Sequence, residues 1–166
     1  MRILISFLSL FVLFKVTQAQ PILYRADIIH TISGQSVANG EMLVNGSRII
    51  SVGKNIVNKP EGTLVVNLKG MQLYPGLIAA TTSLGLTEIN AVRATQDTTE
   101  VGEFTPDVEA WISVNPDSEL IPVTRANGIT HALVVPLGGI VTGTSGLIKL
   151  AGWGVEDMAV AHDVAL

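Results

Sequence analysis

The chain has 166 residues, no cysteine, a formal net charge of −4 and a mean hydropathy of +0.47. The lack of cysteine excludes a disulfide framework and a lipid-anchored cysteine, and the apolar composition argues against intrinsic disorder. An acidic chain without a basic stripe also argues against nucleic acid and anionic membrane surfaces as partners.

Residues 1–19 have the pattern of a secretory signal peptide. Met1-Arg2 supplies a positive start, Ile3 to Phe14 is an apolar core, and Thr17-Gln-Ala19 ends in a small residue. A membrane helix is the alternative, but it needs about 20 apolar residues, and Lys15 ends this run earlier. We therefore expect cleavage after Ala19, export to the periplasm or the extracellular space, and no membrane association afterwards.

Short strands with turns between them are predicted from residue 22 to residue 68. The first strand covers Ile22–Ile29, and two more, over 41–44 and 47–52, flank Asn45-Gly46. An Asn-Gly pair between apolar runs favours a type I′ turn, in which both central residues need φ > 0. With a further strand over 63–68, we expect a small antiparallel sheet or half-sandwich. A self-contained β-domain is the alternative.

An apolar run follows a Pro-Gly break and gives way to small hydroxyl residues, which is typical of a buried strand opening into a loop. This stretch resembles the first barrel strand of the amidohydrolase superfamily, where Pro-Gly-Leu-Ile-Asp precedes a His-x-His metal pair. Pro75 to Ile78 match that motif. Ala79 stands at the position of the Asp, and Thr81 and Ser83 stand at the positions of the two histidines.

The resemblance runs from about Ala26 to Trp153, because Arg125 to Thr130 and the following glycine loop resemble imidazolonepropionase-like amidohydrolases. It implies a β-sandwich built from both ends of the chain and a (β/α)₈ TIM-like barrel. Residues 20–73 would be the sandwich segment, and residues 74–166 the truncated start of the barrel. A barrel needs at least ~200 residues, so we expect a fragment of a longer protein rather than a short relic that requires a partner.

A helix and a second buried strand are predicted after the opening strand. Asn115 suits the N-cap and Pro116 the first helical position, and Gly128 suits the C-terminal stop. Residues 129–136 then read as a strand parallel to the first, and 147–150 as another strand. Helical spacing near the end predicts that the chain stops inside or just after a helix, on the basis of Val155, Met158, Ala159 and His162.

The metal ligands that the resemblance implies are absent from this chain. The other expected ligands, a carboxylated Lys or a Glu, two His and an Asp, would follow Leu166. The three histidines, His30, His131 and His162, show no ligand spacing. We therefore expect no catalytic, cofactor-binding or metal-binding residue here, no zinc although the family implies zinc, and no activity from this chain alone. A hydroxyl nucleophile on Thr81 or Ser83 is the alternative, but no Gly-x-Ser-x-Gly elbow surrounds Ser83.

Two loops allow other interpretations. Residues 87–109 carry carboxylates that could bind Ca²⁺ or Mg²⁺, or attract a cationic substrate to the strand's C-terminal end. Their spacing matches no metal loop, so a solvated, mobile loop is the simpler interpretation. Gly138 to Gly146 could be taken for a phosphate-binding loop, but Thr144 stands where a P-loop requires Lys. A tight glycine loop is therefore expected.

Two functions remain open. The first is an exported amidohydrolase-like enzyme that hydrolyses non-peptide C–N bonds of amides or cyclic amides, with a degenerate first ligand pair. The second is a non-catalytic periplasmic binding or scaffold module that kept the amidohydrolase fold. A small-molecule substrate is expected for an active full-length protein, and a homo-oligomer is a further expectation. The later ligand positions would discriminate, because their presence favours the enzyme and their replacement the binding module.

Overall fold

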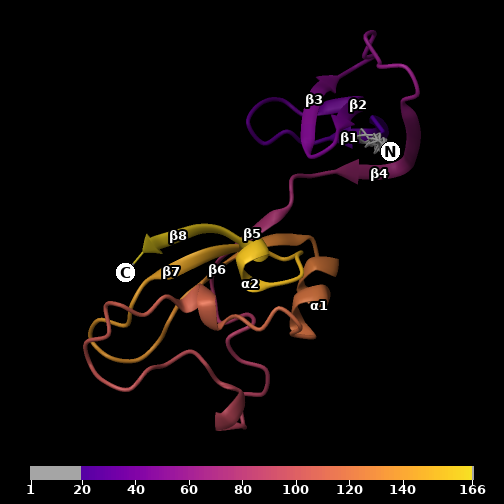
Figure 1. Cartoon of the computed structure of the whole chain (residues 1–166). Helices are drawn as coiled ribbons and strands as arrows, with labels where there is room; N and C mark the ends of the chain where they lie inside the picture. Colours follow the sequence, from indigo (N-terminus) through magenta and orange to yellow (C-terminus); the bar gives the residue numbers. More distant parts are fainter. Residues whose placement is uncertain (1–19, 166) are drawn as a thin grey trace, which may run out of the picture. The chain divides into compact units, whose positions relative to one another are not determined.

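The computed structural model describes residues 20–165, so the signal peptide predicted over 1–19 lies outside the described residues. The described chain divides into two compact units, one ending at Pro75 and the other beginning at Gly76. Each unit contains one four-stranded sheet, coloured indigo to magenta in the first unit and rose to yellow in the second (Figure 1). No helix within residues 20–165 is long and apolar enough to cross a membrane.

The sheet of the first unit has the strand order β3-β2-β1-β4. β1 (Ile22–Ile29), β2 (Val37–Asn45) and β3 (Arg48–Gly53) form an antiparallel meander, as predicted. β4 (Leu64–Leu73) instead pairs in parallel with β1, so the prediction of a purely antiparallel sheet was wrong. The connection over 54–63 is long enough to carry the chain past the meander to the far side of β1.

The core of the first unit is small and is formed by residues of β1 and β2. Leu23, Ala26, Ile29 and Leu43 are buried, while Ile49 and Ile50 of β3 stay exposed. Burying one such large side chain contributes roughly 1.5–3 kcal/mol. Within residues 20–75 the structure thus contains a single sheet, the half-sandwich of the prediction, rather than two facing sheets.

The hairpin between β2 and β3 forms one residue later than predicted. Asn45 pairs with Arg48, which leaves Gly46 and Ser47 as the two turn residues. Gly46 has a φ of 59°, and Ser47 is not among the described residues with positive φ. That combination fits a type II′ turn, which needs φ > 0 at its first central residue only. The predicted type I′ turn at Asn45-Gly46 was therefore wrong, although the hairpin itself is confirmed.

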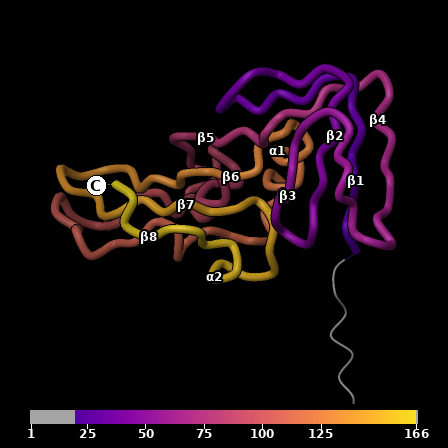
Figure 2. Tube along the Cα trace, turned by 90° about the horizontal axis from the view of Figure 1, so that it is seen from above, coloured from indigo at the N-terminus to yellow at the C-terminus, as the bar shows by residue number. Residues whose placement is uncertain are grey.

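The sheet of the second unit has the order β5-β6-β7-β8, and the tube in Figure 2 follows its path from rose to yellow. β5 (Leu77–Thr82) and β6 (Ile129–Val134) are parallel, and the connection between them contains η1 (Arg93–Thr95), η2 (Ala110–Ser113) and α1 (Leu120–Ala126). β7 (Ser145–Lys149) and β8 (Ala159–Ala165) continue the sheet in antiparallel pairs. One β/α/β unit is present among the described residues, followed by an antiparallel extension.

The start of the helix before β6 differs from the prediction. α1 begins at Leu120 rather than near Pro116, because Asn115 Oδ1 accepts the Asp117 N–H at 3.1 Å and so closes a turn instead of capping the helix. Its end is as predicted, since Gly128 follows with a φ of 87°.

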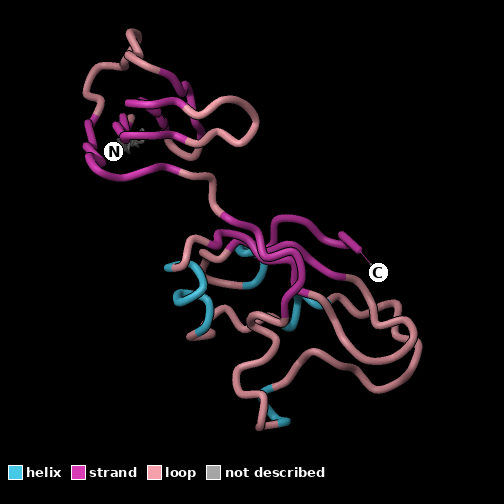
Figure 3. The backbone as a smooth tube through the Cα atoms, turned by 180° about the vertical axis from the view of Figure 1, so that it is seen from behind, coloured by secondary structure: helices cyan, strands magenta, loops and turns pink. Residues whose placement is uncertain are grey.

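The predicted C-terminal helix shrinks to one turn, α2 (Val155–Met158), and the chain continues as β8. Met158 is 1% exposed and ends the turn inside the core, after which the backbone pairs with β7. Figure 3 shows how little of the chain is helical, in cyan, beside the strands in magenta.

The core of the second unit lies between its sheet and the segments that cross it. Val134 and Ile148 come from the sheet, Leu86 from the loop after β5, and Ile121 from α1, and all are buried. The polar end of β5, at Thr81 and Thr82, therefore lies directly before residues of a packed core, Leu84 and Leu86.

Candidate functional site

The candidate site lies where β5 ends, because ligands of parallel β/α structures bind at the carboxyl ends of the strands. Ala79 pairs with Ala132 of β6 and packs against the core. The position that matches the family's Asp is thus filled by a small apolar side chain.

The two hydroxyls at the histidine positions have different surroundings. Thr81 is exposed, and its hydroxyl donates to the carbonyl of Ala80 at 2.8 Å. Ser83 lies one residue beyond β5, and its carbonyl accepts the N–H groups of Leu86 at 2.9 Å and Thr87 at 3.1 Å. Ser83 therefore starts a tight turn instead of continuing the strand.

A cleft of about 190 Å³ opens beside this turn. Its lining is mostly polar, with hydroxyl, amide and carboxylate groups around one buried leucine. The lining residues are Thr82, Ser83, Leu84, Thr87, Glu88, Asn90 and Leu120.

Glu88 is the one carboxylate in this lining, and both of its oxygens are held. Oε1 accepts a hydrogen bond from Asn115 Nδ2 at 3.3 Å, and Oε2 accepts one from Ser118 Oγ at 2.9 Å. Ser118 is only 2% exposed, so this contact is partly shielded from water. The segment before α1 thus fixes the carboxylate in place. Each of its oxygens can still accept a further hydrogen bond from an N–H group in the cleft.

The sequence interpretation missed Glu88, because it treated this residue as one of many acids in a solvated loop. The polar residues around Asn115 were the only available signal, and they were assigned to a helix cap.

The three histidines do not come together. In the first unit, His30 Nδ1 lies 2.9 Å from Ser36 Oγ, Nε2 lies 2.8 Å from Gln72 Oε1, and the ring stacks on Tyr74 with 4.2 Å between centroids. In the second unit, His131 Nδ1 lies 3.0 Å from Thr130 Oγ1.

His162 meets the ring of Trp111 edge-on, with 4.3 Å between centroids. Within residues 20–165, no three His, Cys, Asp or Glu side chains group as a metal site would require.

The acidic segment and the glycine-rich loop pack against each other. Backbone bridges join Phe104 to Val141 and Glu109 to Thr144. A Cβ added at Gly139, which has a φ of 33°, would lie 2.8 Å from the carbonyl oxygen of Glu103. Glycine is required there by close backbone approach, as the tight-loop interpretation expected.

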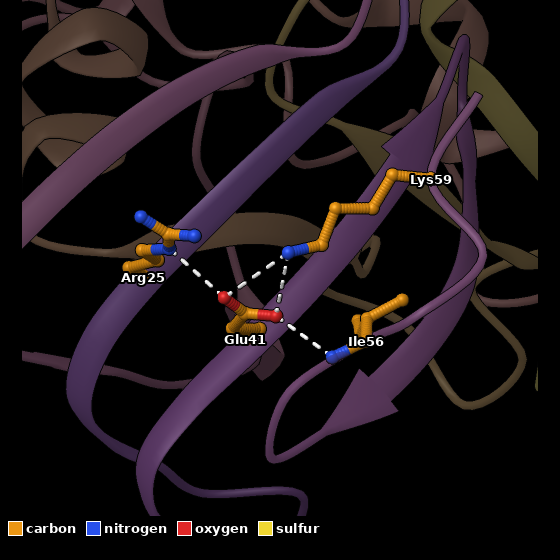
Figure 4. Close-up of polar contacts among 4 residues, drawn as sticks. All are labelled: Arg25, Glu41, Ile56 and Lys59. Atoms are coloured by element: carbon orange, nitrogen blue, oxygen red, sulfur yellow. Dashed lines mark hydrogen bonds and ion pairs between the residues drawn. The ribbon is translucent and has the colours of Figure 1, made fainter. Parts of the chain in front are cut away.

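The strongest charge cluster of the described chain lies in the first unit, around Glu41 (Figure 4). This carboxylate is 7% exposed, and it accepts hydrogen bonds from Arg25 Nε at 2.9 Å and the Ile56 N–H at 2.8 Å. Lys59 Nζ forms an ion pair with it at 3.2 Å. Burial by itself raises the pKa of Glu41, but the Ile56 N–H and the two cations together lower this pKa below its ordinary value. The cluster fastens the connection over 54–63 onto β2.

No family model matches the sequence, and no curated protein matches it either. A solved structure does. An amidohydrolase from Thermotoga maritima MSB8 is 28% identical, with a TM-score of 0.80 over 87% of this chain and 37% of its own. The chain belongs to the amidohydrolase superfamily.

This amidohydrolase-superfamily chain spans 37% of the Thermotoga chain, so the match covers only part of a longer fold. A prolidase complexed with N-methylphosphonate-L-proline is 19% identical, with a TM-score of 0.47 over 69% of this chain and 26% of its own. An A. niger ochratoxinase is 14% identical, with a TM-score of 0.42 over 68% of this chain and 25% of its own. The family assignment rests on the Thermotoga structure.

Proposed function

We propose that this chain is the N-terminal part of an exported hydrolase of the amidohydrolase type, acting on non-peptide C–N bonds of amides or cyclic amides, with a degenerate first metal-ligand pair. The observation that carries the proposal is the match to the Thermotoga amidohydrolase over 87% of the chain. In this view, residues 20–73 form half of the sandwich, and β5, α1 and β6 are the first β/α unit of a (β/α)₈ barrel.

The residues present do not fit the zinc that the family implies. Neutral hydroxyls are poor ligands for Zn²⁺ compared with imidazole or thiolate, and Ala79 packs against the core instead of supplying a carboxylate. We therefore assign no step of a reaction to a metal on this strand.

The cleft at the end of β5 contains both a hydrogen-bond acceptor and a hydrogen-bond donor for an amide. The fixed carboxylate of Glu88 can accept a hydrogen bond from an amide N–H, and the hydroxyl of Ser83 can donate one to the amide carbonyl. Both side chains line the same cleft. A small polar molecule with adjacent N–H and C=O groups is the ligand that this lining matches.

The donor set also favours a second candidate, a non-catalytic binding or scaffold module that kept the fold. Such a protein would use the cleft for binding and would not need the lost imidazoles. The coding sequence after Leu166 separates the two candidates, since intact later His, Lys and Asp positions favour the hydrolase.

The biochemical test is a panel of small amides and cyclic amides offered to the full product of the gene. Release of an amine supports the hydrolase, and ligand-induced thermal stabilisation without turnover supports the binding module. Glu88→Gln should weaken turnover or binding about tenfold or more, the value of one hydrogen bond to a charged group. Glu100→Gln, in the same acidic segment but outside the cleft lining, should have no effect. A panel that is neither hydrolysed nor bound contradicts both candidates.

Metal content provides an independent test. After dialysis against metal-free buffer, elemental analysis of the unmodified chain should find no retained equivalent of zinc. The triple change Ala79→Asp, Thr81→His and Ser83→His should leave at most weak binding, because it supplies too few of the four ligands of a closed site. One equivalent of zinc on the unmodified chain would overturn this reading of the strand.

A further inference from the structure

Three Asn-Gly pairs occur in the described chain, and their surroundings differ. They are Asn39-Gly40, Asn45-Gly46 and Asn127-Gly128. In such a pair, the backbone nitrogen of glycine can attack the side-chain carbonyl carbon of asparagine, because glycine has no Cβ to obstruct the approach. The attack requires a glycine N–H that is free of hydrogen bonds and an asparagine side chain that is free to turn.

Asn45-Gly46 meets both requirements. Asn45 and Gly46 are exposed at the tip of the β2–β3 hairpin. Within residues 20–165, neither the side-chain amide of Asn45 nor the N–H of Gly46 forms a hydrogen bond. The turn is also free of packing, since neither residue belongs to the buried core.

The pair at the end of α1 is held at both reacting groups. The Gly128 N–H donates to the Arg125 carbonyl at 2.9 Å, and Asn127 Nδ2 donates to the Val123 carbonyl at 2.8 Å. Both hydrogen bonds must open before the atoms can meet.

The pair inside β2 is restrained by its sheet. Gly40 is buried and pairs with Ala26 of β1, and a Cβ at Gly40 would lie 2.8 Å from the side chain of Ile29. The backbone there has no room to rearrange into a five-membered ring.

We propose that Asn45 is a site of spontaneous deamidation through a cyclic succinimide, so that the β2–β3 turn is covalently modified without an enzyme. The Gly46 nitrogen forms a bond to Asn45 Cγ, the Cγ–Nδ2 bond breaks, and Nδ2 leaves as ammonia with the proton from the Gly46 nitrogen. Water then opens the ring. Addition at Cγ gives aspartate, and addition at the backbone carbonyl gives isoaspartate, in which the chain runs through the former side chain.

Either product changes the hairpin. A negative charge appears on the residue that pairs with Arg48, so the turn gains an opposite-charge pair across the strands. Isoaspartate also adds a methylene to the backbone, which the two-residue type II′ turn has no place for. The aspartate form should therefore keep the hairpin, and the isoaspartate form should loosen it.

The test is peptide mapping by mass spectrometry after incubating the full chain in mildly alkaline buffer. The peptide with Asn45 should gain the mass difference between Asn and Asp and split into two chromatographic forms, aspartyl and isoaspartyl. Asn127 should react roughly tenfold or more slowly, because two hydrogen bonds protect it. In denaturant the three pairs should deamidate at similar rates, because in the unfolded chain the rate depends only on the local sequence, which is Asn-Gly in all three.

Two variants show whether the fast reaction belongs to Asn45. Asn45→Gln should abolish the fast reaction, and Asn127→Gln should leave it unchanged. Equal rates at Asn45 and Asn127 in the folded chain would overturn the proposal. So would formation of the aspartyl form alone, because direct hydrolysis of the side chain gives no isoaspartate.

Discussion

The carboxylate of Glu41 is buried on β2 and joins nitrogen donors from β1 and from the connection before β4. Removing its charge would leave Arg25 and Lys59 without an anionic partner. Arg25 is half exposed and can be rehydrated, so the loss is smaller than for a fully buried pair.

We expect Glu41→Gln to lower the free energy of unfolding by about 1.5–3 kcal/mol, the range for hydrogen bonds to charged groups. Urea denaturation followed by circular dichroism measures this. Glu61→Gln is the matched control, since Glu61 is exposed and takes part in no ion pair among the described residues. Equal midpoints for the two variants would contradict a stabilising role for the cluster.

The same residue predicts the acid response of the first unit. The pKa of Glu41 is lower in the folded state than in the unfolded state, so its contribution is complete above the unfolded-state pKa. It is lost as the pH falls through the folded-state pKa. The unmodified chain should therefore lose stability on acidification more steeply than Glu41→Gln, as measured by denaturation at a series of pH values. Parallel acid profiles would show that other carboxylates dominate.

At the scale of single elements, the hairpin turn is the clearest constraint. Gly46 has a φ of 59°, a region that a β-branched residue resists. Gly46→Val should cost about 1–3 kcal/mol of stability, visible as a lower denaturant midpoint. Ser47→Ala is the control, because Ser47 is not among the described residues with positive φ. An unchanged midpoint for Gly46→Val would mean that the turn tolerates another conformation.

The elements also show what local sequence can and cannot predict. The bounds of β1 follow from its β-prone run and the turn residues after it. The direction of β4 does not, because a parallel and an antiparallel partner can have the same local pattern. The last segment was assigned to a helix because Val155 and Met158 are three residues apart, yet the same stretch also fits a strand once a partner lies beside it.

The candidate site shows the same limit. Thr81 and Ser83 were found because they stand at known positions of a motif. Glu88 was missed because its two partners, Asn115 and Ser118, lie 27 and 30 residues further along the chain. Only the fold brings them together.

For the whole molecule, we propose that the protein is exported. The motivation is the positive start, apolar core and small-residue ending of residues 1–19. Expressed in a Gram-negative host, the protein should reach the periplasm and begin at Gln20, as N-terminal sequencing would show. Intact Met1 on protein from the cytoplasm would count against export. Replacing Leu10 with Arg should block cleavage, since a charge interrupts the apolar core.

The parallel pairing of β1 with β4 sets an order of events for a chain that is still being synthesised. β1, β2 and β3 are neighbours in sequence and can pair early. Ile22 pairs with Leu64, so β1 can pair with β4 only after the intervening loop closes, and closing so long a loop costs entropy. Until then, one side of β1 is an open edge that other chains could join. Once Glu41 holds Ile56 and Lys59 on β2, only the short stretch up to Leu64 would still have to close before β4 pairs with β1.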